Sequence, residues 1–154
     1  MDHVLQPVQP SHFAVVAGWL DSPAATLRWA GPGVPFPLPA EAFAAALGLP
    51  SRPGWTLQDA DGICLGFGQY WQAAPGSTHL GRIIVSPQAR GRGLGRVLMT
   101  SLCAEALRSS AAVQLTLKVY RDNQAAVALY RDLGFVASED ASTPELLFMA
   151  CRTT

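Results

Sequence analysis

The chain has 154 residues, 49% of them hydrophobic and 14% charged, a composition that indicates one folded domain over residues 1–154 and excludes a disordered chain. Its 11 Lys and Arg residues balance 11 Asp and Glu residues, so no overall charge draws it to nucleic acid or to an anionic membrane. Three widely separated cysteines match no zinc spacing, and no apolar run nears the roughly 18 residues of a membrane span. We therefore expect a cytoplasmic protein with no metal and with neither nucleic acid nor membrane as a partner.

The first half of the chain is expected to form short helices, an irregular segment and a hairpin. Ser11 fits the N-cap of a first helix, and four prolines and two glycines make residues 31–39 irregular. The pair Asp61-Gly62 between two strand-like runs predicts a β-hairpin turn. The expected elements are a strand at 3–9, helices at 10–20 and 40–49, two strands around the turn within 54–73, and a strand at 79–86.

The second half alternates helices and strands. Leucine and alanine recur at helical spacing within residues 95–108, which predicts a helix there. The run VQLTLKVY, residues 113–120, alternates apolar and polar residues as a strand does. A capped helix at 123–134 and a last strand at 145–151 follow. Strands first, and then strands alternating with helices, predict a mixed α/β (α+β) sheet.

Glycines and arginines gather in VSPQARGRGLGRVLMTSL, residues 85–102, between an apolar strand and a helix. Glycine lets backbone N–H groups approach an anion closely, arginine adds a cationic fork of donors, and a helix N-terminus favours negative charge. A glycine-rich turn with solvated arginines is the simpler interpretation of these residues alone. Arg96-Val97 after Gly95 excludes a Walker A loop, and the glycine spacing does not fit a dinucleotide fingerprint. The stretch therefore points to a phosphate-bearing ligand of another kind.

Two motifs carry a resemblance to a known family. VSPQARGRGLG resembles the acetyl-CoA pyrophosphate loop of the GNAT acetyltransferases, where a strand ending in V-x-P precedes R/Q-x-x-G-x-G/A. NQAAVALYRDLGF is similar to a second motif of that family, because Asn123 opens a helix, Tyr130 follows seven residues later, and Gly134-Phe135 ends the run. The motifs stand in the family's order and cover residues 78–136 or thereabouts.

The resemblance implies the GNAT fold, a mixed and mostly antiparallel central sheet flanked by about four helices. Two neighbouring parallel strands, 79–86 and 113–120, are implied to splay apart and to hold the pantetheine arm of acetyl-CoA between them. The implied acetyl-CoA contacts are Ile83, Ile84 and Val85 on the strand, Arg90, Gly91, Arg92, Gly93, Leu94, Gly95 and Arg96 in the loop, and Asn123 and Tyr130 on the later helix.

The same resemblance implies acetyl transfer to a primary amine by direct attack in a ternary complex. Tyr130 is similar to the family's general acid, and a phenol with a pKa near 10 suits a thiolate leaving group. By residue type alone, a tyrosine in a core stripe is the better interpretation of Tyr130, and the neighbouring motif favours the acid. The Ile83 N–H is implied to polarise the thioester carbonyl. Asn123 caps its helix, contacts the acetyl-CoA arm, or does both.

The general base has no clear motif. Family members that acetylate protein N-termini commonly carry a glutamate where this chain has Lys118, which argues against that type of activity. His79, at the start of the cofactor strand, has a reference pKa near 6.5 and is the candidate base. An exposed histidine at a strand end is the equal alternative.

The acceptor site is the least determined part of the sequence. Trp29 and Phe36, in a proline-stiffened segment, either line a pocket for an apolar or flat group or pack a surface loop. The acceptor is expected to be a small-molecule or peptide amine, and a homodimer is compatible with the sequence. A non-catalytic CoA or acyl-CoA sensor is the alternative function. The nearby acids that could attract an ammonium group are Glu41, Asp59 and Asp61.

Overall fold

The chain is built on one seven-stranded sheet. The computed structural model describes residues 2–153, and its sheet has the order β1-β2-β3-β4-β5-β7-β6, with β4–β5 as its parallel pair and every other pair antiparallel. The strands are β1 (Val4–Pro7), β2 (Gly54–Gln58), β3 (Cys64–Ala74), β4 (Ser77–Val85), β5 (Gln114–Tyr120), β6 (Val136–Ser138) and β7 (Leu146–Arg152). The helices are α1 (Pro10–Ala17), α2 (Pro23–Ala30), α3 (Ala40–Leu47), α4 (Leu94–Ser109) and α5 (Gln124–Asp132), with 3-10 turns at Pro87–Ala89 and Glu139–Ala141.

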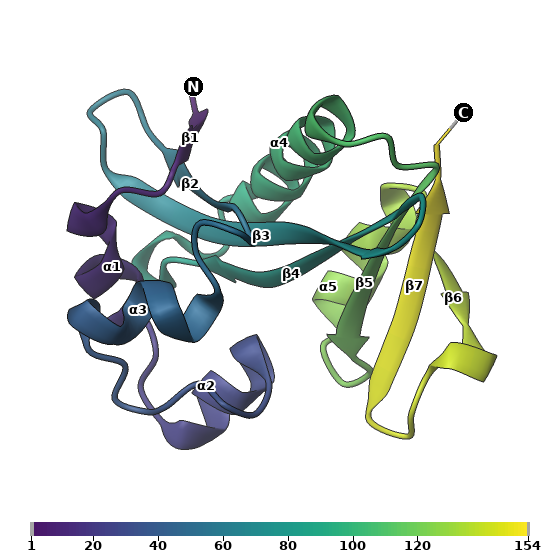
Figure 1. Ribbon diagram of the computed structural model, residues 1–154, viewed down its shortest axis with the longest axis horizontal. Helices are drawn as coiled ribbons and strands as arrows, with labels where there is room; N and C mark the ends of the chain where they lie inside the picture. The colour runs from purple at the N-terminus through teal and green to yellow at the C-terminus, as the bar shows by residue number, and fades with distance from the viewer. Residues whose placement is uncertain (1, 154) are drawn as a thin grey trace.

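Helices cover both faces of the sheet (Figure 1). α4 crosses β3 and β4 on one face and buries its stripe of Leu98, Leu102 and Ala106 completely, where each leucine contributes roughly 1.5–3 kcal/mol by burial. A Cβ at Gly68 on β3 would stand 2.8 Å from Leu102, so glycine is what lets this helix approach the sheet. α1 and α3 pack around Phe67 on the opposite face. These packed layers confirm the mixed α/β fold expected from the sequence.

One helix was missed in the sequence. The structure has five α-helices within residues 2–153, not about four, because α2 occupies Pro23–Ala30, just before the segment interpreted as irregular. Ser22 caps it, its Oγ accepting a hydrogen bond of 3.0 Å from the Ala25 N–H, and Pro23 takes the first helical position. The signal was present as Ser22-Pro23 and a following Gly31, but the helix is only eight residues long and rich in alanine.

The parallel strands separate soon after they begin. β4 and β5 pair only over Ser77–His79 and Gln114–Thr116, whereas β3 stays paired with β4 as far as Val85 and β7 stays paired with β5 as far as Tyr120. The sheet therefore opens along the second half of β4 (Figure 1), which confirms the splayed pair that the resemblance implied.

A bulge accompanies the opening. The β3–β4 register shifts between Phe67 and Gln69, and Arg82 on β4 adopts φ +55°, the one positive φ of a non-glycine residue within residues 2–153. A bulge increases the local twist of a strand and re-aims its side chains. A non-glycine residue held in the left-handed region costs of order 1–3 kcal/mol, and such residues cluster at active sites and ligand clamps.

Candidate active site

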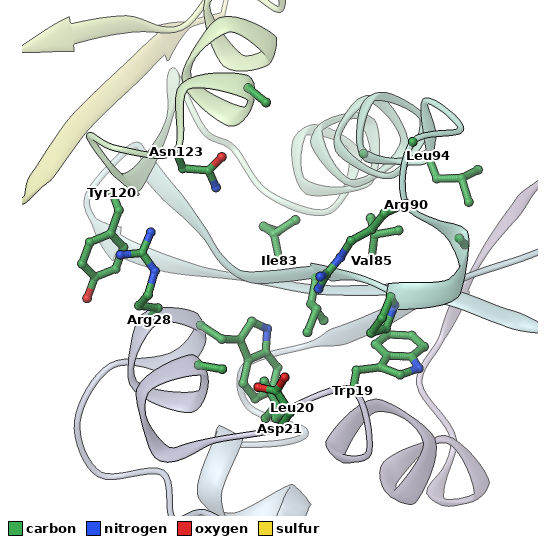
Figure 2. Close-up of a pocket in the computed structure, with 18 of the residues that line it drawn as sticks. Trp19, Leu20, Asp21, Arg28, Ile83, Val85, Arg90, Leu94, Tyr120 and Asn123 are labelled. Carbon is green, nitrogen blue, oxygen red and sulfur yellow. The ribbon is translucent and has the colours of Figure 1, made fainter.

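A cavity of about 730 Å³ lies where β4 leaves β5. Four parts of the chain line it: the end of β4, the loop that leads into α4, the start of α5, and the segment from α1 into α2. Figure 2 shows Ile83 and Val85 of β4 between Asn123 at the start of α5 and Asp21 ahead of α2. We call this space the larger cavity. It brings together Trp29, Ile83, Ile84, Val85, Arg90, Gly91, Gly93, Leu94, Gly95 and Asn123 from the residues predicted from the sequence.

The free edge of β4 can pair with an extended ligand. The Ser86 N–H donates to the Leu65 carbonyl across the β3–β4 ladder at 2.8 Å. Because backbone groups alternate between the two edges of a strand, those of Val85 and Ile83 face the gap that β5 has left. The edge is therefore free of a strand partner where the resemblance implied pairing with a pantetheine arm.

The glycine loop presents a concave array of donors. Gly91 and Gly93 have φ of +81° and +75°, and Gly93 is the N-cap residue of α4. A Cβ at either glycine would meet nothing within 4 Å, so the backbone there is open to a ligand. Within residues 2–153 the backbone N–H groups of residues 90–96 donate no hydrogen bond. Unpaired N–H groups at a helix N-terminus suit a pyrophosphate.

The four arginines near the loop have different surroundings. Arg90 reaches along the cavity wall in Figure 2, and its side chain lines the larger cavity. Arg92 turns back, with Nη2 3.4 Å from the Gln88 carbonyl, and Arg96 forms an exposed ion pair with Asp132 at 3.0 Å. Neither Arg92 nor Arg96 lines the cavity through its side chain, so only part of the predicted arginine cluster faces a ligand.

Asn123 caps α5 and lines the larger cavity. Its Oδ1 accepts a hydrogen bond of 3.3 Å from the Ala126 N–H. Both interpretations of the sequence therefore fit this geometry: the side chain starts the helix, and it stands at the cavity wall.

Tyr130 lies in the core beneath that wall. It is 9% exposed, packs edge-on against Phe135 with ring centroids 6.2 Å apart, and does not line the larger cavity. Burial, with a smaller effect of nearby Cys103, raises the pKa of the Tyr130 phenol to about 12. At neutral pH this hydroxyl therefore carries its proton, but the raised pKa makes it a weaker acid than the phenol with a pKa near 10 that was expected from the sequence.

His79 lines a second space of about 270 Å³, the smaller cavity, which shares Arg28, Trp29 and Tyr120 with the larger one. Its Nδ1 shares a hydrogen bond of 2.8 Å with Thr116 Oγ1. Burial first, then the charges of Lys118 and Arg52, lowers the pKa of His79 to about 4. The expected pKa near 6.5 was therefore too high, because the sequence could not reveal the burial or the two cations.

Of the two residues predicted to line the acceptor site, one lines the cavities and the other does not. Trp29 lies on α2, not in a loop, and lines both cavities; its buried indole N–H has no acceptor within residues 2–153. Phe36 is 37% exposed and lines neither cavity, so it matches the surface-loop alternative. The acids Glu41, Asp59 and Asp61 line neither cavity.

Sequence reasoning missed the residues that α2 and the preceding segment supply. Trp19 and Asp21 line the larger cavity, and Arg28 stacks over the Tyr120 ring at 4.1 Å (Figure 2). The Nη2 of Arg28 also pairs with Asp122 at 2.8 Å. The cap signal of α2 could have located this wall. Nothing in the sequence indicated which strand it would face.

Two further features, a metal site and a membrane-spanning helix, have no support within the described residues. Residues 2–153 contain no group of three or more His, Cys, Asp or Glu side chains arranged to hold a metal ion. No helix over the same residues has both the length and the hydrophobicity to cross a bilayer.

Residues 21–135 match the family model of the acetyltransferase (GNAT) family, and this range contains both sequence motifs and the larger cavity's β4 edge and loop. The chain belongs to the GNAT acetyltransferase family. The resemblance drawn from the two motifs is thereby confirmed.

Curated relatives share the sequence over part of their length. Mycothiol acetyltransferase of Mycobacterium sp. (strain JLS) is 39% identical over 132 residues, which cover 81% of this chain and 38% of that protein. The mycothiol acetyltransferase of Streptomyces coelicolor is 36% identical over 89 residues, 56% of this chain and 28% of that protein. This GNAT chain thus spans well under half the length of the curated relatives it matches.

Solved structures share the fold. A chimera of the spermidine N-acetyltransferase SpeG from Vibrio cholerae and hSSAT has a TM-score of 0.76 at 16% identity, over 99% of this chain and 96% of that one. The aminoglycoside acetyltransferase AAC(6')-Ib, solved with paromomycin and acetyl-CoA, has a TM-score of 0.78 at 17% identity, over 99% and 94%. At such identities the likeness concerns the fold, and it agrees with the GNAT fold expected from the motifs.

Proposed function

We propose that this protein transfers an acetyl group from acetyl-CoA to the primary amine of a small molecule. The observation that carries the proposal is the opening beside β4. There a strand edge without a partner runs directly into a loop of free N–H groups, and one cavity of about 730 Å³ lies over both. Membership of the GNAT family and the similarity to part of the mycothiol acetyltransferases support the same activity.

Different parts of the larger cavity would bind the successive parts of acetyl-CoA, from the pyrophosphate to the pantetheine arm. The N–H groups of residues 90–96 would hold the pyrophosphate, with Arg90 adding charge. The edge of Ile83 and Val85 would pair with the pantetheine amides as an added strand does. Asn123 would contact the same arm from α5.

In the proposed reaction the amine nitrogen forms a C–N bond with the acetyl carbon, and the C–S bond of the thioester breaks. The amine loses a proton, and the sulfur of CoA gains one. The Ile83 N–H, at the free edge of β4, would stabilise the charge that develops on the carbonyl oxygen. Tyr130, whose hydroxyl carries its proton at neutral pH, would supply the proton to sulfur.

His79 is our candidate for the group that removes the amine proton. With its pKa lowered to about 4, the imidazole is neutral at pH 7 and has a lone pair available on one ring nitrogen. It lines the smaller cavity, which adjoins the larger one through Trp29 and Tyr120. From this position His79 could take the proton from the amine directly or through one water molecule.

The test combines binding and turnover on the chain as it stands. Calorimetry should detect binding of acetyl-CoA and of CoA to the protein. Acetyl-CoA should also raise the melting temperature of the protein, because it binds only the folded state. Thiol release, followed in a panel of primary amines, should require both acetyl-CoA and an amine. Acetyl-CoA that neither binds nor stabilises the protein would overturn the cofactor assignment.

The same panel separates an enzyme from a binding module. If acetyl-CoA binds and none of the amines releases thiol above the buffer rate, the protein is a CoA-binding module and the proposed transfer is wrong. Release of thiol without formation of an acetylated amine would instead indicate thioester hydrolysis. Mass measurement of the amine product distinguishes these results.

A further inference from the structure

The smaller cavity is cationic. Arg28, Arg82 and Lys118 line it, and its lining contains no Asp or Glu. Arg28 is balanced by its ion pair with Asp122, but within residues 2–153 Arg82 and Lys118 have no carboxylate within 4 Å. Glu145, the residue before Leu146 of the lining, is exposed and is not part of the cavity wall. Two cations therefore face this space without a neutralising group.

Arg82 is held in place by a buried framework. Its Nη1 donates to the Leu47 carbonyl at 3.1 Å and to Gln69 Oε1 at 3.2 Å. Gln69 is fully buried, and its Nε2 donates to the carbonyls of Leu47 and Arg52, each at 3.0 Å. All these partners are neutral. The fold thus fixes the guanidinium at the cavity and leaves its charge uncompensated.

A second guanidinium stands close to the first. Arg52 stacks over the Trp71 ring at 4.3 Å and Arg82 lies 5.3 Å from the same ring centre. Two like charges on one aromatic ring, with no acid between them, disfavour each other unless an anion joins them. Arg82 also has a positive φ of +55°, a strained backbone conformation of the kind that clusters at ligand-binding sites.

The position of Lys118 adds to the same charge. It follows Thr116 by two residues on β5, so both side chains project from the same face of that strand, and Thr116 bonds to His79. Lys118 and Arg52 both disfavour the protonated form of His79. A positive potential therefore extends over the imidazole, and Arg82, Arg28 and the Trp71 ring complete its surroundings.

We infer that the acceptor of the proposed transfer carries an oxyanion, a carboxylate or a phosphate, close to its amine, and that Arg82 and Lys118 bind it. This inference rests on the proposed function. An anion between these two side chains would offset their charges and leave the amine near the neutral His79. A polycationic acceptor, such as the spermidine named for one of the structural neighbours, would meet repulsion in this cavity.

Matched acceptors test the inference. L-phenylalanine, L-phenylalaninamide and phenethylamine share an aromatic group and an amine but differ in the carboxylate; O-phosphoethanolamine and ethanolamine form the phosphate pair. We expect kcat/KM to be about tenfold or more higher for the anionic member of at least one set, mostly through KM, because a charge-assisted pair has about that effect. Spermidine should be the poorest acceptor. The two sets distinguish a carboxylate from a phosphate.

Variants place the effect in the smaller cavity. Lys118→Met and Arg82→Met should each reduce the ratio of kcat/KM between the anionic acceptor and its uncharged partner. Lys118→Glu should reverse this preference, so that phenethylamine becomes the better acceptor. Lys118 is exposed, so its variants should fold even if loss of the Arg82 contacts destabilises the protein. Arg152→Met is the matched control, since Arg152 is exposed at the far end of β7 from Leu146 and should leave the preference unchanged.

Product binding gives a readout that does not depend on turnover. By calorimetry with CoA present, N-acetyl-L-phenylalanine or N-acetyl-phosphoethanolamine should bind more tightly than its uncharged partner, and Lys118→Met should remove the difference. Equal binding of the partners, or spermidine as the best substrate, overturns the inference while leaving acetyl transfer intact. Failure of every amine in a protein that binds acetyl-CoA overturns the proposed function instead, and the product-binding comparison then decides the anion site alone.

Discussion

The larger and smaller cavities adjoin at Trp29 but are built from different chemical groups. The wall of the larger cavity is mostly backbone: the free edge of Ile83 and Val85 and the N–H groups around Gly91 and Gly93. The smaller cavity is defined by side chains from α2, β3, β4 and β5. A backbone site needs particular glycines at particular spacing, which a sequence reveals. A side-chain site depends on which strands lie next to one another, and the proposed acceptor site is of this kind.

Tyr130→Phe should have the largest effect on turnover. If the Tyr130 hydroxyl protonates the leaving sulfur, kcat should fall by roughly 10²–10⁴, the usual contribution of a positioned acid. The loss of one hydroxyl from a core of similar volume should leave acetyl-CoA affinity and the amine's KM nearly unchanged. Steady-state kinetics with the best acceptor measures this.

Tyr70→Phe is the matched control for that measurement. Tyr70 belongs to the same hydrophobic cluster, is 6% exposed, and stacks on Trp55 at 6.4 Å, away from both cavities. Equal kcat values for Tyr130→Phe and Tyr70→Phe would mean that Tyr130 only packs the core. Its absence from the lining of the larger cavity makes this comparison decisive.

His79→Gln should lower kcat/KM by about 10² at neutral pH, the lower end for a general base. Because burial and the two cations lower the pKa of His79 to about 4, the acidic limb of the wild-type profile should lie near 4 and not near 6.5. His12→Gln, on α1 and outside the lining of both cavities, should leave the profile unchanged. A wild-type limb near 6.5 that survives in His79→Gln would assign the base to another group.

The same histidine should affect stability in acid. The folded pKa of His79 lies below its unfolded value, so the folded state binds fewer protons. Its contribution to stability is present above about pH 6.5 and is lost as the pH falls toward 4. In urea unfolding, the wild type should therefore lose stability relative to His79→Gln as the pH falls from about 6.5 to 4. A difference that does not change with pH would contradict the lowered pKa.

The secondary structure was predicted from the sequence with unequal success along the chain. The helix at 95–108 and the strand at 113–120 were predicted within about two residues, because their hydrophobic periods are regular over many residues. Trp29 was placed in a loop because α2 is short and lies between proline-rich segments. Three-residue β6 left no pattern of its own.

The chemistry divides in the same way. The glycine loop and Asn123 could be located from motifs, since each needs a fixed residue at a fixed spacing from a helix start. The pKa of His79 and the cationic smaller cavity could not, because they depend on Lys118 and Arg52, which lie 66 positions apart in the sequence numbering. Long-range contacts of this kind have no local signal.

Gly93→Val should weaken acetyl-CoA binding by about tenfold or more. A valine at φ +75° is strained, and its side chain would stand among the N–H groups proposed to hold the pyrophosphate. Gly62→Val is the matched control: Gly62 has φ +80°, meets nothing within 4 Å, and lies in the β2–β3 turn. Calorimetry should show intact affinity in Gly62→Val alone, with similar loss of stability in both. Equal affinities would remove the loop from the binding site.

The smallest expected effect separates two neighbouring arginines. Arg90 lines the larger cavity, whereas the Arg92 guanidinium turns to the Gln88 carbonyl outside it. Arg90→Ala should therefore weaken acetyl-CoA binding a few-fold, and Arg92→Ala should change it less. Since an exposed charge acts through a screened field, the Arg90→Ala effect should shrink between about 0.05 and 0.5 M salt, as the Debye length falls. Calorimetric titrations at both salt concentrations measure this. A larger loss of affinity in Arg92→Ala than in Arg90→Ala would mean that the loop binds its ligand in another orientation, with Arg92 toward the phosphates. An effect of Arg90→Ala that does not change with salt would contradict a screened charge at Arg90.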